Sequence, residues 1–385
     1  MKLQQNYSCL SLGLCVTLAM AIAPTAYGAS EPIKIGVQAP ITGTYADEGQ
    51  GIERAVQLLA AQQNAKGGLL GRKIEVITCD DRGEAAQAAI CARQLVDDHV
   101  VAVIGSYTSG AALAAQPIYA RANVIQTSDG TSNELLKHGY KTWFGNAAPN
   151  SAEAEFTAHY LVDVRHFGKI AVLTDHSSFA TGLADAVVKD VEADHGNVVD
   201  KSFINAGSQN FSPVLTKLKA MHPDALYFSG YYSDGGLIRA QMVQLGMKAA
   251  FVGGDANQNV AFAKIAGSAA AGSIIVNVPA PADLPYPTAK QFVAAYKTKY
   301  GSLPPSVFTL TNADGMRAVM QAIKATKSLK PAKLEAYLHG VKSFQGLTGT
   351  FAWNAKGERT GSPFVAFEIQ KDGSYKILYP APTAG

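Results

Sequence analysis

The chain has 385 residues, of which 48% are hydrophobic and only 16% are charged. This length corresponds to two or three domains with a sizeable core, and the scattered glycines and prolines exclude collagen-like and disordered classes. The formal net charge is +3, from 33 Lys and Arg against 30 Asp and Glu, and no basic run occurs. The composition therefore gives no electrostatic basis for binding nucleic acid.

The first 28 residues have the pattern of an export signal. Lys2 supplies a positive start, an uncharged apolar stretch occupies residues 10–23, and small residues suit cleavage after Gly28. The apolar stretch has about 14 residues, fewer than the ~20 that a membrane-spanning helix needs. We therefore expect residues 1–28 to be a signal peptide and the mature chain to be soluble in the periplasm, without stable membrane insertion.

Two cysteines stay in the mature chain, Cys79 and Cys91. An even pair in an oxidising compartment predicts one disulfide, here between the end of an expected strand and the helix that follows it. The alternative is two free buried thiols. The eight histidines form no HExxH motif and no CxxC occurs, so we expect neither a bound metal nor another cofactor.

Strands and helices alternate along most of the mature chain. Apolar runs between turn residues predict the strands, and apolar spacings of three and four residues predict the helices. Such alternation is typical of parallel sheets with helices on both faces. In the first part we expect strands at 33–39, 73–79, 100–105 and 124–127, with helices at 51–63, 84–96 and 111–121.

A second series of the same kind begins near residue 150. We expect helices at 153–164, 182–192, 212–221 and 235–245, with strands at 169–173, 198–203, 225–228, 250–252 and 273–278. After a connector at 278–283, helices at 288–299, 314–325 and 331–338 are expected to return and cover the first lobe. Short strands at 350–353, 364–370 and 375–378 are expected to extend the second sheet.

The sequence contains no motif typical of an enzyme. Gly49-Gln50-Gly51 begins like a dinucleotide-binding fingerprint, but Arg54 occupies the last position and the turn opens a helix. The spacing of a P-loop is not met, and no GxSxG or Ser-His-Asp arrangement stands out. We expect no catalysis, and an exported α/β enzyme is the least favoured interpretation.

Hydroxyl-rich turns follow two strands of the first lobe, where the carboxyl ends of the strands face the expected cleft. Ser109 lies in the turn 104–110, ahead of a helix, and the turn 128–132 contains Thr131. Hydroxyls and free backbone N–H groups at a helix N-terminus suit an anion such as a carboxylate. The alternative for each turn is an ordinary helix cap without a ligand.

The second lobe offers an acidic group at a corresponding place. Asp255 follows the strand 250–252, and Tyr231 and Phe179 follow two other strands of that lobe. A carboxylate there suits an ammonium group, although Asp255 is equally a plain helix cap and the aromatic rings equally the edge of a core. An anion site in one lobe and a carboxylate in the other together predict a receptor for a zwitterion.

The sequence resembles the branched-chain amino-acid (leucine/isoleucine/valine) periplasmic binding proteins, the type I solute-binding proteins of ABC importers. The resemblance extends over nearly all of the mature chain. Its most specific part is the NAKGG turn followed by a strand that ends in two aspartates. The segments that carry it include 35–37, 40–43, 64–72, 80–81 and 251–253.

The resemblance implies an α/β fold with two Rossmann-like lobes joined by three crossover strands around a cleft. Its boundaries are expected at 29–148 plus 280–349 for lobe I, and at 149–279 plus 350–385 for lobe II. It further implies that Ser109, Thr131 and the backbone at Gly130 hold the carboxylate of the ligand. Asp255 and Tyr231 then meet its ammonium, and Phe179 and Tyr107 form the pocket wall.

The sequence departs from the family pattern at three positions. Asp255 stands where branched-chain binders often have the longer Glu, and Ala313 stands in place of a larger wall residue. Glu48 aligns with an aromatic residue that packs on the ligand, with Tyr45 as the neighbouring candidate for that wall position. These departures leave room for a ligand other than Leu, Ile or Val.

The predicted function is capture of an amino acid, aliphatic or related, by hinge closure and its delivery to an ABC transporter permease. We expect a periplasmic monomer that binds a small molecule and no nucleic acid. A non-amino carboxylate, such as an aromatic acid, is the alternative ligand, and Asp255 would then have no cationic partner.

Overall fold

The computed structural model describes residues 1–6, 31–361 and 363–380. One compact unit begins at Glu31 and contains every element named below. Most of the expected signal peptide, including its apolar stretch, lies outside the described residues. Among the described residues, no helix combines the length and the apolar character that crossing a bilayer requires.

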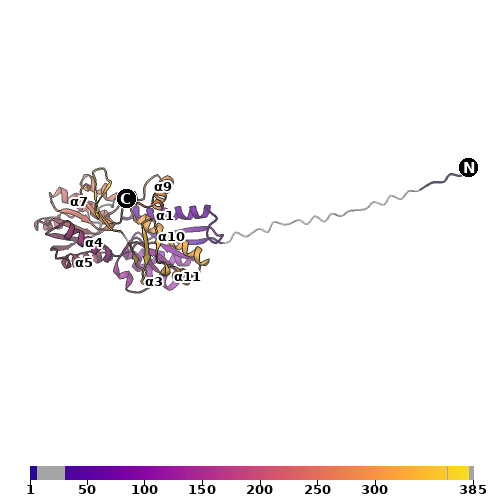
Figure 1. Ribbon diagram of the computed structural model, residues 1–385, viewed down its shortest axis with the longest axis horizontal. Helices are drawn as coiled ribbons and strands as arrows, with labels where there is room; N and C mark the ends of the chain where they lie inside the picture. The colour runs from indigo at the N-terminus through magenta and orange to yellow at the C-terminus, as the bar shows by residue number, and fades with distance from the viewer. Residues whose placement is uncertain (7–30, 362, 381–385) are drawn as a thin grey trace. The chain divides into compact units, whose positions relative to one another are not determined.

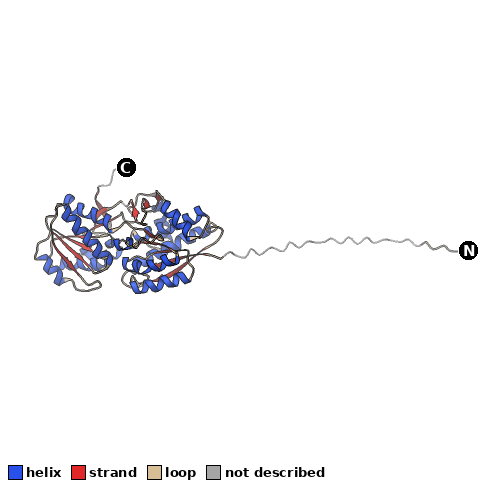
Figure 2. Ribbon diagram, turned by 90° about the horizontal axis from the view of Figure 1, so that it is seen from below, coloured by secondary structure: helices blue, strands red, loops and turns tan. Residues whose placement is uncertain are grey.

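The first sheet has five parallel strands in the order β2-β1-β3-β4-β5. Its strands are almost wholly buried apart from the edge strand β2, and helices surround the strands in Figure 2. The strands are β1 (Ile33–Ala39), β2 (Ile74–Asp80), β3 (Ala102–Ile104), β4 (Ile125–Ser128) and β5 (Trp143–Gly145). The intervening helices are α1 (Ala46–Ala65), α2 (Ala85–Asp97) and α3 (Ser109–Ala122).

The second sheet has seven strands in the order β15-β14-β10-β9-β8-β6-β7. Five strands are parallel: β6 (Ile170–Thr174), β7 (Val198–Phe203), β8 (Ala225–Ser229), β9 (Ala250–Gly253) and β10 (Ile274–Asn277). Its helices are α4 (Asn150–His159), α5 (Ser178–Ala193), α6 (Ser212–Lys219), α7 (Tyr232–Gln244) and α8 (Val260–Ala266). In Figure 1, α4, α5 and α7 gather in one half, with α1, α3, α10 and α11 in the other.

The C-terminal part of the chain contributes to both lobes. The helices α9 (Pro287–Tyr300), α10 (Phe308–Thr326) and α11 (Pro331–Gly340) return to the first lobe, as expected. Strands β14 (Val365–Ile369) and β15 (Tyr375–Tyr379) extend the second sheet as an antiparallel hairpin, which confirms that part of the prediction.

The expectation that residues 350–353 extend the second sheet is wrong. They form β12 (Thr350–Trp353), which pairs with β11 (Phe344–Gln345) and β13 (Arg359–Thr360) in a separate three-stranded sheet. The reason is local packing, since the Trp353 indole donates to the Gly145 carbonyl at 2.7 Å and so ties β12 to β5. The lobe boundaries given above stay a prediction.

Most helices begin earlier than the apolar spacing predicts, by up to six residues at α10, which starts at 308 and not at 314. The first turn of α1 contains Gly49, where a Cβ would lie 2.1 Å from the Pro40 carbonyl oxygen, so close packing requires a residue of low helix propensity. Helix α10 starts at Phe308 because burial stabilises a threonine-rich turn that propensity disfavours. Helix α4 starts at residue 150 and is followed by a π-helical turn at 160–164.

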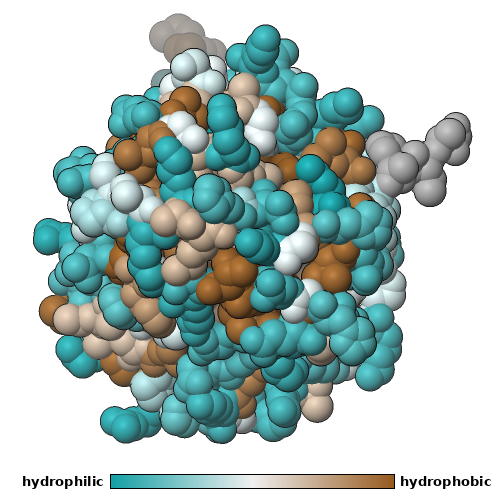
Figure 3. Space-filling model, turned by 90° about the vertical axis from the view of Figure 1, so that its left-hand side faces the viewer, coloured by the Kyte–Doolittle hydropathy of each residue, from teal (hydrophilic) through white to brown (hydrophobic). Residues whose placement is uncertain are grey.

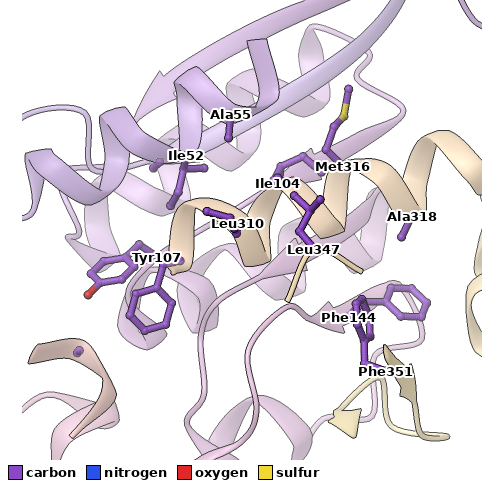
Figure 4. Packing of buried hydrophobic residues seen from close by; sticks show 14 of the residues in the cluster. Ile52, Ala55, Ile104, Tyr107, Phe144, Leu310, Met316, Ala318, Leu347 and Phe351 are labelled. Carbon is purple, nitrogen blue, oxygen red and sulfur yellow. The ribbon is translucent and has the colours of Figure 1, made fainter. Parts of the chain in front are cut away.

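Helix α10 forms the centre of the first lobe. Its Leu310 and Met316 belong to one buried cluster with Ile52 of α1 and Ile104 of β3, as Figure 4 shows. On the face seen in Figure 3, hydrophilic residues predominate and hydrophobic areas lie scattered among them. The core therefore fixes the strand ends of the first lobe, on which the site depends.

The predicted disulfide is confirmed. Cys79 on β2 and Cys91 on α2 are bonded, with their Cα atoms 5.5 Å apart. The bond ties a strand to the helix that follows it within the first lobe.

Candidate functional site

A small cavity lies where strand ends of the two lobes meet. The empty space along its lining is about 220 Å³ when the solvent at its mouth is included, and only about 10 Å³ of it is open to the centre of a water molecule. Each lining residue is at most 6% exposed, so the lobes are closed over it. The lining consists of Tyr107, Ser109, Asp129, Thr131, Phe179, Tyr231, Asp255, Ala256 and Phe308. Six of these nine residues are among the predicted site residues, and they come from both lobes.

Ser109 lies at the first turn of α3 with its hydroxyl proton uncommitted. Thr108 serves as the helix cap, because its hydroxyl oxygen accepts from the Ala111 N–H at 3.3 Å. The Ser109 hydroxyl oxygen instead accepts from the backbone N–H groups of Thr131 and Ser132, at 3.1 and 3.2 Å. Since two donors occupy its lone pairs, this hydroxyl is left to donate its own proton. Ser109 is therefore suited to an acceptor such as a carboxylate oxygen.

Gly130 lies beside the cavity rather than in its lining. Its N–H donates to the Ser128 hydroxyl at 3.0 Å and is thereby used within the turn. A Cβ at this position would lie 2.7 Å from a methyl group of Leu135 and 3.1 Å from the Cβ of Ala112. The turn therefore packs closely on α3, and contact between the Gly130 backbone and a ligand stays a prediction.

Asp255 presents a free carboxylate oxygen in the second lobe. It follows β9 in a short 3₁₀ turn, is 4% exposed, and its Oδ1 has no hydrogen-bond partner among the described residues. Burial raises the pKa of Asp255 to about 7, because the charged form loses its hydration. A cation placed beside Oδ1 would restore the favourable environment of the carboxylate. Asp255 is thus suited to an ammonium group.

Aromatic rings from both lobes form one wall. Tyr231 packs against Phe179, with ring centroids 5.1 Å apart, and against Tyr107 at 5.8 Å. Tyr107 in turn meets Phe308 at 5.4 Å. Tyr45 does not line the cavity but packs against Tyr231, with tilted rings whose centroids are 4.5 Å apart. Such a wall favours an apolar portion of a ligand.

Glu48 joins the two lobes instead of lining the cavity. Its carboxylate oxygens accept from the Asn259 amide and the Ser306 hydroxyl, both at 2.6 Å. Burial raises the pKa of Glu48 to about 7. Ala313 is buried within α10 and is not a lining residue either. Direct roles of Glu48 and Tyr45 at a ligand stay predictions.

Sequence reasoning missed Asp129, Ala256 and Phe308 as lining residues. Asp129 belongs to the turn that was singled out, but its side chain accepts from Thr311 at 2.8 Å and from Asn312, both on α10. Burial raises the pKa of Asp129 well above its usual value. In the sequence, only the position of Asp129 next to Gly130 indicated that it lies at the cavity. Nothing local marks Phe308, whose place depends on the return of α10 to the first lobe.

The model of a family described as periplasmic binding protein matches residues 32–374. This chain belongs to the periplasmic binding protein family. It is 30% identical to the Leu/Ile/Val-binding protein homolog 2 of Brucella abortus over 96% of this chain and 98% of that relative. It is also 30% identical to the Leu/Ile/Val-binding protein of Escherichia coli K12, over 94% of this chain and 96% of the relative.

The type I fold of periplasmic binding proteins is confirmed by solved structures. One is the branched-chain amino acid transporter substrate binding protein LivJ from Streptococcus pneumoniae in complex with isoleucine. It superposes with a TM-score of 0.83 and 28% identity, over 90% of this chain and 99% of that one. The Brucella and Escherichia relatives are named as binding proteins, and the Streptococcus structure is named as the substrate binding protein of a transporter. The family name also agrees with the predicted periplasmic location.

Proposed function

We propose that this chain captures an α-amino acid between its lobes and delivers it to the permease of an ABC importer. One observation carries the proposal: the cavity has an uncommitted hydroxyl donor at Ser109 in one lobe and an unpartnered carboxylate oxygen at Asp255 in the other. A zwitterion satisfies both at once, and burying its charges is tolerable only when each is paired. The names of the relatives support an aliphatic side chain, which suits the aromatic wall.

The proposed cycle of binding, closure and delivery follows from the position of the two polar groups in different lobes. A ligand held from both sides stabilises the closed arrangement, because the open one cannot make both sets of contacts together. The remaining parts of the proposal are removal of residues 1–28 as a signal peptide, a monomeric state, and recognition of the closed form by the permease. Catalysis has no part in the cycle.

Isothermal titration against the twenty amino acids tests the proposal. We expect binding of one or a few of them, and Asp255→Asn should weaken that binding at least ~100-fold, because a buried ammonium then lacks its counter-charge. Asp97→Asn, at an exposed position at the end of α2, is the matched control and should change nothing. Unchanged affinity of the Asp255 variant would remove this residue from the site. Tight binding of an aromatic acid alone would favour the alternative ligand.

A further inference from the structure

A second buried carboxyl group lies directly behind Asp255. Glu153 is in the first turn of α4, is 1% exposed and does not line the cavity. Its Oε1 accepts from the backbone N–H of Asp255 at 2.9 Å, and the two side chains are within hydrogen-bonding reach of each other. Two acids more than 100 positions apart in sequence therefore form one buried pair.

Close packing at Gly254 holds this pair together. A Cβ at residue 254 would lie 2.9 Å from Glu153 Oε1 and 3.0 Å from the Tyr227 hydroxyl. A side chain at residue 254 would therefore press on the Glu153 carboxyl and on the Tyr227 hydroxyl. Glycine at this position thus leaves room for the Glu153 carboxyl to reach the backbone N–H of Asp255.

The surroundings of the pair do not neutralise two negative charges. No Lys, Arg or His forms an ion pair with either acid among the residues that the structure describes. Arg359 lines a neighbouring cavity together with Asp255, but its Nη atoms donate to the Asn146 carbonyl and to Thr348. The other titratable groups that face the pair are Glu48, Tyr107, Tyr227 and Tyr231. Two adjacent buried carboxylates cannot both ionise at modest cost, so the pair retains a proton.

We propose that Glu153 is a positioning residue for ammonium recognition: it keeps its proton at neutral pH, donates it to Asp255 and thereby presents Asp255 to the ligand as a single anion. This inference rests on the proposed function. The proton is placed on Glu153 because Asp255 lines the cavity, where a cation can compensate its charge, whereas the buried Glu153 does not reach the cavity. Burial and the charge of Asp255 raise the pKa of Glu153 well above its usual value.

With one shared proton, the negative charge of the acid pair matches the positive charge of the ligand's ammonium group. One negative charge on the pair faces one positive charge on a primary ammonium, so the closed cavity stays neutral at this end. The hydrogen bond from Glu153 also restricts rotation of the Asp255 side chain. It holds one carboxylate oxygen and leaves Oδ1 for the ligand. Asp255, which is shorter than the Glu often found at this position in the family, is thereby held in place by Glu153 on the side away from the cavity.

Binding measured as a function of pH tests the role of Glu153. Glu153→Met keeps the length of the side chain but removes the donor, so Asp255 should hold its own proton to higher pH. Titrations with L-leucine, L-isoleucine and L-valine from pH 6 to 8.5 should show the onset of tight binding shifted upward by about one to two pH units. Glu153→Gln, whose amide also donates, should restore the wild-type profile, and Glu155→Met on the exposed side of α4 is the matched control.

Two results of these titrations would overturn the proposal. A loss of affinity in Glu153→Met that is equal at every pH would indicate packing alone. Loss of binding in Glu153→Gln as severe as in Asp255→Asn would make Glu153 the anion.

A ligand-free measurement separates this proposal from the proposed function. A carboxyl whose native pKa is raised takes up a proton on folding, so its stabilising contribution is lost as pH rises above the unfolded pKa. Between pH 5.5 and 8, the unfolding free energy of the wild type should therefore fall more steeply with pH than that of Glu153→Gln. The difference in slope should correspond to one additional proton released on unfolding. Equal slopes would show an ionised Glu153 and refute the proposal. If none of the three amino acids binds the wild type, the proposed function fails and this comparison still decides the state of Glu153.

Discussion

At the residue scale, the proposed recognition depends on two buried polar groups whose hydrogen bonds are not all made within the protein. The Ser109 hydroxyl has accepted both of its donors and still has a proton to give, whereas Asp255 Oδ1 has no donor at all. An unsatisfied buried polar group costs about 1–3 kcal/mol, and more when it is charged. A ligand that has a carboxylate and an ammonium removes both costs, which a ligand with only one of them cannot do.

Glu48 should make the stability of the protein depend on pH. Its native pKa of about 7 lies above the usual 4.5, so the protonated form is favoured in the folded state. Stability that is present at pH 4.5 is therefore lost as pH rises through 7. Urea unfolding of Glu48→Gln should give a free energy above that of the wild type at pH 8, by at most ~3 kcal/mol, with the difference vanishing below pH 4.5. Glu75→Gln, at an exposed position of β2, is the control, and a parallel response of both variants would contradict this role of Glu48.

The sequence located the lining residues that follow strands but not those that depend on long-range packing. Ser109, Thr131 and Asp255 were identifiable because the carboxyl ends of parallel strands meet at one edge. Glu153 escaped notice because a Glu in the first turn of a helix is ordinary for helix formation. Its contact with Asp255 exists only once α4 packs against the turn after β9.

At the element scale, strands were predicted more accurately than helix starts. β1 and β7 have the expected bounds because residues typical of turns flank them: β1 lies between Pro32 and Pro40, and β7 follows Gly196 and Asn197. The starts of α1 and α10 were missed because their first turns are stabilised by close packing that outweighs their low propensity. The assignment of residues 350–353 failed because short strands pair with whichever edge tertiary packing offers.

The Cys79–Cys91 disulfide joins β2 to α2 and should stabilise the first lobe. A closed loop of this size limits the unfolded chain and contributes ~3 kcal/mol in the chain-entropy description. Urea unfolding with and without reductant should show a loss of that order, and thiol labelling of the unfolded, unreduced protein should find no free thiol in the mature chain. Neither cysteine lines the cavity, so affinity for the ligand should change little. Labelled cysteines, or equal stability in both conditions, would contradict this expectation.

At the scale of the whole molecule, the closed lobes are held by contacts around the cavity as well as within it. Glu48 bonds Asn259 across the cleft, and the Tyr232 hydroxyl donates to the Thr44 carbonyl at 3.2 Å. A ligand that enters an enclosed cavity requires these contacts to break and re-form, which is hinge motion. The fold and its two lobes were predictable from the alternation of elements, whereas these closing contacts were not.

The central claim is that one lobe binds the carboxylate of the ligand and the other binds its ammonium. The most direct test is to titrate the best-binding amino acid and two of its analogues, one without the amino group and one without the carboxylate. We expect each analogue to bind at least ~100-fold more weakly, because each leaves Asp255 or Ser109 incomplete in a dry site. Either analogue binding within about threefold of the amino acid would contradict recognition of both charges from facing lobes.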